Sequence, residues 1–263
     1  MRDLLEAVAD GSLTPAEAEA ALVGYVTDDA GRFDASRPAR RGIPEAIYAP
    51  GKTPGEVTSL VVTALESTGS ALVTRASDEQ VEAVDRHLAS RFPAVSIERR
   101  RGSLLARRAG RNADELDASV AIVTGGTADG PVADEAALVC EVCGVPVTRI
   151  DDVGVAALDR VLDQVDRIRE TDVVIVAAGR EGALPTVVAG LVAAPVIGVP
   201  VSSGYGHGGG GEAALAGLLQ SCTVLSTVNV DAGFVAGAQA TLIARAIDRA
   251  RRGEIDDSSG SSS

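Results

Sequence analysis

The stretch VAIVTGGTADGPVADEAALVC, residues 120–140, decides the fold of this chain. It begins with a continuous run of apolar residues, which is typical of a strand buried on both faces. A glycine-containing turn follows, and the small apolar residues beyond it predict a helix over 132–143. The same order returns downstream, with strands predicted at 145–149, 172–177, 196–199 and 224–228 and helices at 155–168, 183–192, 212–220 and 234–251. This alternation predicts a three-layer α/β fold with a doubly wound parallel sheet, which we assign to residues 118–252.

Two smaller regions precede this domain. Residues 1–50 are expected to form a helical extension, because Thr14 to Glu17 has the pattern of a capping box with proline at the first helical position. Residues 51–117 are expected to form a small α/β region, opened by a second capping box at Thr53 to Glu56. Its predicted elements are a helix to about 67, a strand at 71–74, a helix at 78–90 and a strand at 94–98.

Three segments show no clear periodicity in the spacing of their apolar residues. Residues 27–44 are rich in Arg and Asp and are interpreted as an extended connection. Residues 99–112 are strongly basic, and two interpretations fit them, a solvated loop or an anion-binding edge. Residues 253–263 end in Ser and Gly and predict a disordered tail.

Composition argues against several classes of protein. Among 263 residues, Lys and Arg total 24 and Asp and Glu total 37, so the formal net charge is −13, whereas nucleic-acid binders need a basic face. The longest apolar stretch, 187–201, is interrupted by Gly and Pro and is shorter than the roughly 20 residues of a membrane-spanning helix. Three cysteines without a signal-peptide pattern indicate a cytoplasmic protein.

Doubly wound sheets bind ligands at the carboxyl ends of their strands. This rule selects four turns that supply our candidate substrate-binding residues: Gly125, Gly126 and Thr127; Asp152 and Gly154; Gly179, Arg180 and Gly182; and Ser202, Ser203, Gly204 and Tyr205. Asp129 and Glu181 lie in two of these turns, where a carboxylate either caps a helix or takes part in a site. His207, in the glycine-rich loop after Tyr205, is either a general base or an exposed residue without a role.

The cysteines fall into two groups. Cys140 and Cys143 form a C-x-x-C pair inside a predicted helix, and no second pair exists to complete a zinc site. Cys222 follows Ser221 at the end of a predicted helix, where a cysteine is either a small buried residue or a nucleophile.

Taken in order, several segments resemble the LarB family. They are GTADGPVADEA at 126–136, DVGV at 152–155, EGALP at 181–185, residues 195–205 and Ser221–Cys222, with RGIPE at 41–45 and GKTP at 51–54 upstream. The resemblance covers about residues 40 to 250. The LarB family is in turn similar to the purine-biosynthesis carboxylase that acts on aminoimidazole ribonucleotide.

The resemblance implies a flavodoxin-like fold and a definite reaction. Members of the family carboxylate the pyridinium ring of nicotinic acid adenine dinucleotide at C5, using CO2 or bicarbonate and no organic cofactor. They also hydrolyse the phosphoanhydride, which releases AMP and leaves pyridinium-3,5-biscarboxylic acid mononucleotide. This product is a precursor of the nickel-pincer cofactor, which serves lactate racemase or another racemase or epimerase.

The resemblance also assigns roles to residues. Cys222 is the expected nucleophile, because thiolate addition at C4 of the ring makes C5 nucleophilic toward CO2. Asp129 and Glu181 are expected to transfer protons or to order a Mg2+ ion near the phosphates, and the ligands of that metal are not assigned. A homo-oligomer is implied, with the octamer of the purine carboxylases as its pattern.

Some positions depart from the related families. Purine carboxylases have a histidine where this chain has Asp151 to Gly154, and Met-Pro where it has Ser221–Cys222. Both differences argue against aminoimidazole ribonucleotide as substrate. Arg180 stands where many LarB relatives have an apolar residue. A purine-type carboxylase or mutase and a non-catalytic dinucleotide-binding module remain as alternatives.

Overall fold

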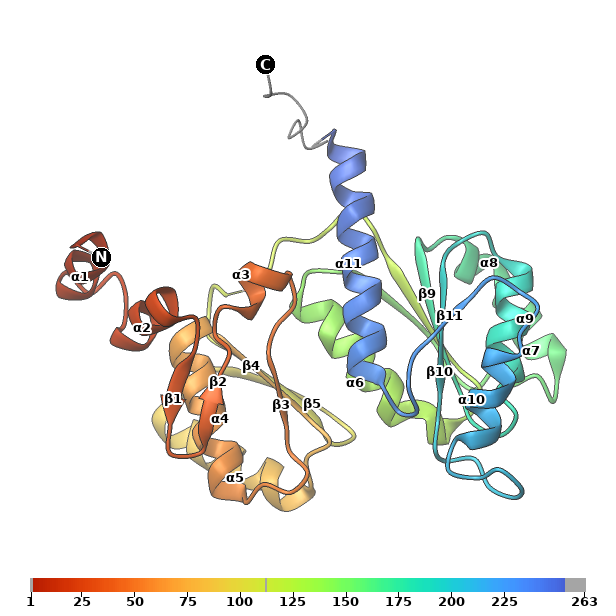
Figure 1. Ribbon diagram of the computed structural model, residues 1–263, viewed down its shortest axis with the longest axis horizontal. Helices are drawn as coiled ribbons and strands as arrows, with labels where there is room; N and C mark the ends of the chain where they lie inside the picture. The colour runs from red at the N-terminus through yellow and green to blue at the C-terminus, as the bar shows by residue number, and fades with distance from the viewer. Residues whose placement is uncertain (1, 112, 254–263) are drawn as a thin grey trace. The chain divides into compact units, whose positions relative to one another are not determined.

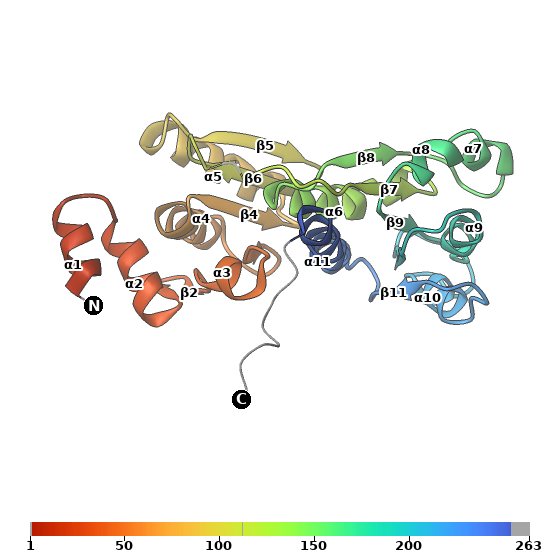
Figure 2. The ribbon, with the colours of Figure 1, turned by 90° about the horizontal axis from the view of Figure 1, so that it is seen from above.

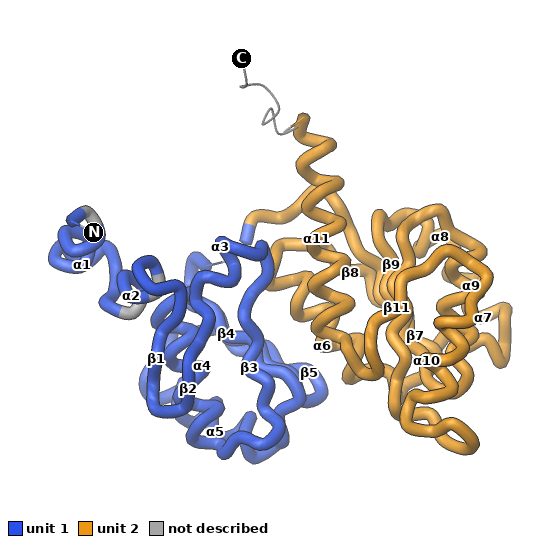
Figure 3. Tube along the Cα trace, viewed as in Figure 1, with its two compact units in different colours: residues 1–113 blue, residues 114–263 orange. Residues whose placement is uncertain are grey.

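The computed structural model describes residues 2–111 and 113–253, and the chain divides into two compact units. Figure 3 shows unit 1, Met1–Ala113, and unit 2, Asp114–Ser263. The tail predicted at 253–263 lies outside the described residues, apart from Gly253.

Unit 1 combines helices with a small mixed sheet. Its elements are α1 (Arg2–Ala9), α2 (Pro15–Val23), β1 (Val26–Asp28), β2 (Gly31–Phe33), α3 (Arg37–Arg41), β3 (Ala46–Tyr48), α4 (Pro54–Thr68), β4 (Ser70–Thr74), α5 (Asp78–Arg91), β5 (Ser96–Arg100) and β6 (Ser103–Arg107). The strand order is β3-β4-β6-β5, with β3 and β4 parallel and the other neighbours antiparallel. Both predicted capping boxes are confirmed: the Glu17 N–H donates to Thr14 Oγ1 at 3.1 Å and the Glu56 N–H donates to Thr53 Oγ1 at 3.2 Å.

Two predictions for unit 1 were wrong. The segment 27–44 is not an extended connection, since it contains the β1–β2 hairpin and α3. The basic segment 99–112 is not a loop, since β6 lies inside the sheet and its Leu104 and Leu105 are fully buried. Arginines on both sides of this short apolar run dominated the composition of the window and hid the strand.

Unit 2 contains the predicted alternation. Its elements are β7 (Val120–Thr124), the 3-10 turn η1 (Thr127–Asp129), α6 (Gly130–Val142), β8 (Val147–Ile150), α7 (Leu158–Leu162), α8 (Val165–Arg169), β9 (Val173–Ala178), α9 (Ala183–Leu191), β10 (Val196–Pro200), α10 (Glu212–Leu219), β11 (Ser226–Thr227) and α11 (Gly233–Arg252). The helix predicted over 155–168 is instead two short helices, because the chain turns at Asp163 and Gln164.

The sheet of unit 2 is parallel throughout and has the order β11-β10-β9-β7-β8. Helices α6 and α11 cover one face, and α9 and α10 cover the other (Figures 1 and 2). The predicted three-layer doubly wound α/β fold is confirmed. Because all strands run in one direction, the turns after them gather at one edge of the sheet.

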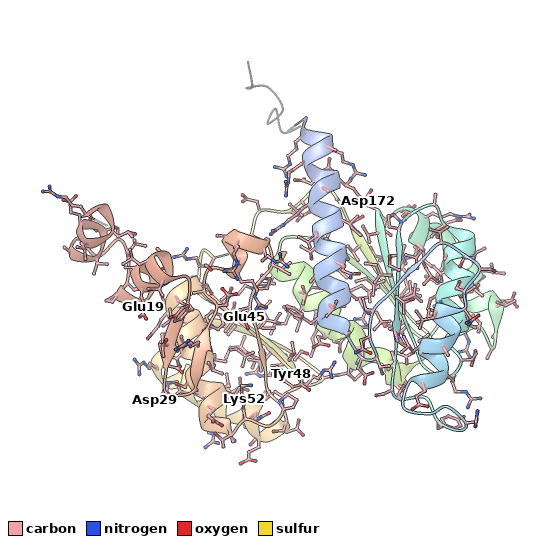
Figure 4. The ribbon with its side chains drawn as sticks, in the orientation of Figure 1. Glu19, Asp29, Glu45, Tyr48, Lys52 and Asp172 are labelled. Atoms are coloured by element: carbon pink, nitrogen blue, oxygen red, sulfur yellow. The ribbon has the colours of Figure 1, made fainter. Side chains whose placement is uncertain are left out.

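Glycines allow α11 to pack closely against α6 in this unit. A Cβ on Gly237 of α11 would lie 2.6 Å from the carbonyl oxygen of Ala136 of α6, so only glycine fits there. At the other end of α11, Arg251 forms an ion pair with Asp172, which is labelled in Figure 4. Asp172 also accepts a hydrogen bond from the Ser119 N–H at 2.9 Å, so α11 is tied to the start of β7.

None of the described helices combines the length and the apolar character needed to cross a lipid bilayer.

Candidate functional site

A cavity of about 600 Å³ lies at the carboxyl-terminal edge of the parallel sheet in unit 2. The connections that follow β7, β8, β9 and β10 all contribute to it. Its lining consists of Gly125, Gly126, Ala128, Asp129, Gly154, Val155, Ala156, Ala178, Gly179, Arg180, Glu181, Ala183, Leu184, Ser203, Gly204 and Tyr205.

Most of the predicted site residues line this cavity. The ones that do not are Thr127, Asp152, Gly182, Ser202 and Cys222. The prediction missed an apolar part of the lining, formed by Ala128, Val155, Ala156, Ala178, Ala183 and Leu184. These side chains carry no reactive group, and their only signal in the sequence is that each lies beside a glycine turn. Together they make part of the cavity wall apolar.

Asp129 is the most enclosed polar residue of the cavity, with 4% of its surface exposed. Its Oδ2 accepts a hydrogen bond from the Gly126 N–H at 2.8 Å, and its Oδ1 accepts one from Ser203 Oγ at 3.4 Å. Backbone amides of Gly125 and Gly179 also favour its ionised form. Burial nevertheless outweighs these contacts and raises the pKa of Asp129 above its usual range. A carboxyl group in this state can hold or release a proton inside the cavity.

The turn after β8 is held by polar contacts beneath the cavity. Thr124 Oγ1 donates to Asp151 Oδ1 at 3.2 Å and accepts a hydrogen bond from the Asp152 N–H at 3.1 Å. Arg149 pairs with Asp151 at 2.7 Å and with Asp134 of α6 at 3.0 Å. These contacts hold Gly154 against the turn that follows β7.

Gly154 itself is required by that close approach. A Cβ at this position would lie 2.6 Å from the carbonyl oxygen of Gly125. Asp152, predicted to bind substrate, instead faces Arg160 at 3.6 Å and is exposed.

The turns after β9 and β10 meet through Arg180 and Tyr205. Arg180 has a left-handed backbone, with φ of 54°, and its guanidinium carbon lies 4.5 Å from the centre of the Tyr205 ring. Gly204 packs against the Arg180 backbone so closely that a Cβ on it would lie 2.6 Å from the Arg180 nitrogen. The loop after β10 is therefore fixed to the turn after β9 at the cavity wall.

Cys222 lies between α10 and β11 and is exposed. The preceding residue, Ser221, accepts a hydrogen bond from Thr186 Oγ1 at 2.9 Å. Thr186 belongs to α9, and Leu184 in the first turn of that helix lines the cavity. Cys222 thus lies beside the helix that begins at the cavity, outside the lining itself.

The other two thiols are enclosed between α6 and α11. Burial raises the pKa of Cys140 to about 12 and that of Cys143 to about 11, so both are protonated at neutral pH. Their place in the helix packing favours a structural role.

A metal site made by the protein alone does not fit the cavity. In the described part of the chain, no three His, Cys, Asp or Glu side chains gather as a metal-binding group. The oxygens of Asp129 face N–H and O–H donors, which orient their positive ends toward the place a cation would occupy. A Mg2+ ion here would depend on oxygens of the substrate, as is common for this ion.

Comparisons with known proteins agree along the length of the chain. A family model for AIR carboxylase matches residues 119–259, and one described as the LarB/PurE-like N-terminal domain matches residues 25–99. The uncharacterised protein MJ0165 of Methanocaldococcus jannaschii is 35% identical over 252 residues, which cover 93% of this chain and 97% of the relative. A crystal structure of PurE from Treponema denticola aligns with 54% of this chain and 98% of its own, at 18% identity and a TM-score of 0.39.

Proposed function

Because this chain belongs to the LarB family, which is related to AIR carboxylase, we propose that it is a pyridinium-3,5-biscarboxylic acid mononucleotide synthase. It carboxylates nicotinic acid adenine dinucleotide at C5 and hydrolyses the phosphoanhydride, releasing AMP. It does so in the cytoplasm, as a homo-oligomer and as part of nickel-pincer cofactor synthesis. Membership of a carboxylase-like family supports an enzyme, and the particular substrate is our proposal.

The observation that carries the proposal is the link between the cavity and an exposed thiol along α9. Leu184 lines the cavity, and Thr186, two positions further, holds Ser221 next to Cys222. Two helical positions correspond to a rise of about 3 Å and a rotation of about 200°, so Leu184 and Thr186 lie on different sides of α9. In the proposed complex a pyridinium ring lies against the apolar lining with the buried carboxyl group of Asp129 on the side of η1, and the exposed Cys222 thiol reaches the ring from beyond α9.

The chemistry needs both groups. A pyridinium ring is an electrophile and does not attack CO2, so the Cys222 thiolate first adds to C4 and leaves an enamine-like ring. C5 then attacks CO2, and a base removes the proton from C5 as the thiolate departs. Asp129 and Glu181 are the carboxylates in reach of the cavity for this proton, since both line it. In the proposed reaction Cys222 is regenerated.

The test is mass spectrometry of products formed from nicotinic acid adenine dinucleotide and 13C-labelled bicarbonate, in the presence of Mg2+. We expect the wild type to give labelled biscarboxylated mononucleotide and AMP. Cys222→Ala should give none, because the adduct at C4 no longer forms. Cys143→Ala removes a buried thiol outside the cavity and should give the wild-type product.

Other outcomes would assign other functions. Turnover of aminoimidazole ribonucleotide that survives Cys222→Ala would show a purine-type carboxylase, the activity named by the matching family model. Dinucleotide binding without product or covalent adduct would show a binding module. Either result would overturn the proposal.

A further inference from the structure

The glycine turn after β7 looks at first like an anion site, because backbone N–H groups of such turns commonly hold phosphate. Here the N–H groups of both glycines are already engaged. The Gly126 N–H donates to Asp129 Oδ2 at 2.8 Å, and the Gly125 N–H donates to the carbonyl oxygen of Ala177 at 3.0 Å. The carboxyl group of Asp129 therefore already accepts the hydrogen bond that the Gly126 N–H could give to an anionic group of a ligand.

With the Gly126 N–H engaged, a cationic side chain elsewhere in the cavity is the stronger partner for an anionic substrate. Among the lining residues that the structure describes, Arg180 is the only one with a cationic side chain. It forms no ion pair with any carboxylate of the described residues. Its side chain is exposed at the cavity wall and is stacked over Tyr205 at 4.5 Å.

We propose that Arg180, held by Tyr205, binds an anionic oxygen group of the substrate and so determines which ligands this cavity accepts. The inference rests on the proposed function for the identity of the substrate, and the ring carboxylate and the diphosphate of the dinucleotide are its two sources of such a group. A carboxylate and a phosphate present the same chemistry to a guanidinium group, namely two oxygens that pair with two N–H groups.

Tyr205 is suited to hold the guanidinium group of Arg180 in one orientation. Stacking on an aromatic face fixes the plane of the guanidinium group and leaves its N–H edge directed sideways. Gly204 anchors the ring in turn, since its contact with the Arg180 backbone leaves no room for a side chain. The left-handed conformation of Arg180 is unusual for a residue with a Cβ, and such conformations persist where the surroundings fix them.

The experiment is isothermal titration calorimetry on the full chain, which reads binding without catalysis. The panel of ligands is nicotinic acid adenine dinucleotide, nicotinamide adenine dinucleotide, AMP and aminoimidazole ribonucleotide. We expect Arg180→Met to weaken binding of the nicotinic acid dinucleotide by about 10-fold to 100-fold, the range of a hydrogen bond to a charged group. The affinity of Arg180→Lys for this dinucleotide should lie between those of the wild type and Arg180→Met. Tyr205→Phe keeps the aromatic ring and should bind with the wild-type affinity, whereas Tyr205→Ala should bind about 2-fold to 5-fold more weakly.

The two sources of the anionic group give different patterns. If Arg180 binds the ring carboxylate, the nicotinamide dinucleotide binds weakly and does not respond to Arg180→Met. If Arg180 binds the diphosphate, both dinucleotides lose affinity equally. Each pattern supports the inference.

Arg75 in unit 1 is a matched control. It has the same left-handed backbone, with φ of 55°, and it is stacked on Tyr48 at 5.7 Å, but it does not line the cavity. Tyr48 is labelled in Figure 4. Arg75→Met should bind the dinucleotide as the wild type does. A loss equal to that of Arg180→Met would point to a general structural effect and overturn the inference.

The remaining outcomes separate this inference from the proposed function. If Arg180→Met binds within about 2-fold of the wild type, the inference is wrong whatever the enzyme does. If dinucleotide binding depends on Arg180 but no carboxylated product forms, the inference stands and the proposed function fails. If aminoimidazole ribonucleotide alone binds and depends on Arg180, the inference stands with another substrate. If the wild type binds no member of the panel, both fail.

Discussion

The two sheets of this chain contrast in how they use their loops. In unit 2 every neighbouring pair of strands is parallel, so the connections after four strands meet at one edge and enclose a cavity. In unit 1 only β3 and β4 run parallel, and the antiparallel strands send their connections to both ends. Strand direction, rather than composition, decides which unit gathers reactive side chains.

Hollow volume alone would not have identified the site. Unit 1 contains a hollow of about 610 Å³ between α4 and α5, as large as the cavity of unit 2. It is lined by residues of these two helices, such as Thr58, Ala83 and His87. The cavity of unit 2 differs in holding a buried carboxyl group, Asp129, among its lining.

The largest expected effect on stability comes from the same substitution in each unit, Leu184→Ala in unit 2 and Leu104→Ala in unit 1. The pair tests whether only unit 2 binds the substrate. Both leucines are buried, with 2% and 0% of their surface exposed. Each substitution should lower the free energy of unfolding by about 2–5 kcal/mol, because it removes buried methyl groups and leaves a void. Only Leu184→Ala should also weaken dinucleotide binding, since Leu184 lines the cavity.

Urea unfolding followed by circular dichroism measures the first effect and calorimetry the second. A loss of affinity in Leu104→Ala as large as in Leu184→Ala, measured where both are folded, would break the contrast between the units.

Two glycines give the next effect. Gly182 has φ of 68°, and a Cβ on it would lie 2.6 Å from the carbonyl oxygen of Ala214, so Gly182→Ala should destabilise by about 2–4 kcal/mol. Gly55, near the start of α4, has no atom within 4 Å of where its Cβ would be. Gly55→Ala should be neutral or should stabilise by up to about 1 kcal/mol, since alanine favours helix. Thermal unfolding of the two variants measures the direction of each change in stability. Equal changes in Tm for Gly182→Ala and Gly55→Ala would contradict the expectation.

The smallest effect is a difference in pH dependence. Burial raises the pKa of Asp129 above its ordinary 3.8, so its stabilising contribution is fully present below that value and is lost as the pH rises through the raised pKa. Hydrogen bonds from the Thr53 backbone and side chain lower the pKa of Glu56 below its ordinary 4.5. Its contribution has the opposite sign, present above that value and lost as the pH falls through the lowered pKa.

Denaturant unfolding from about pH 3 to about pH 7 measures both contributions. The stability of the wild type relative to Asp129→Asn should increase on acidification, and relative to Glu56→Gln it should decrease. Parallel curves for the two variants would show that the two carboxyl groups do not differ in this way.

The sequence predicted unit 2 much better than unit 1, for physical reasons. Strands such as 120–124 and 173–178 are buried on both faces, so they leave continuous apolar runs that composition cannot hide. Strand β6 is as deeply buried, but it is short and lies between arginines, and the charge of its surroundings decided the interpretation. The short hairpin β1–β2 carries no periodic signal at all.

The site was predictable where a rule of topology applied to it. Turns after parallel strands could be read from the chain, and Gly125, Asp129, Arg180 and Tyr205 do line one cavity. What the sequence cannot give is the direction of a backbone N–H group. In the first turn, the Gly126 N–H donates to Asp129 and the Gly125 N–H donates to Ala177, and neither direction can be read from the chain.

The enclosed carboxyl group of Asp129 has a consequence for the protein in a cell. A turn with open amides would attract inorganic phosphate and sulfate, which are abundant competitors of any phosphorylated substrate. With Asp129 holding the Gly126 N–H, small inorganic anions meet a carboxyl group at this turn instead of a free amide. We therefore expect inorganic phosphate to bind weakly at this turn, which leaves anion binding in the cavity to the guanidinium group of Arg180.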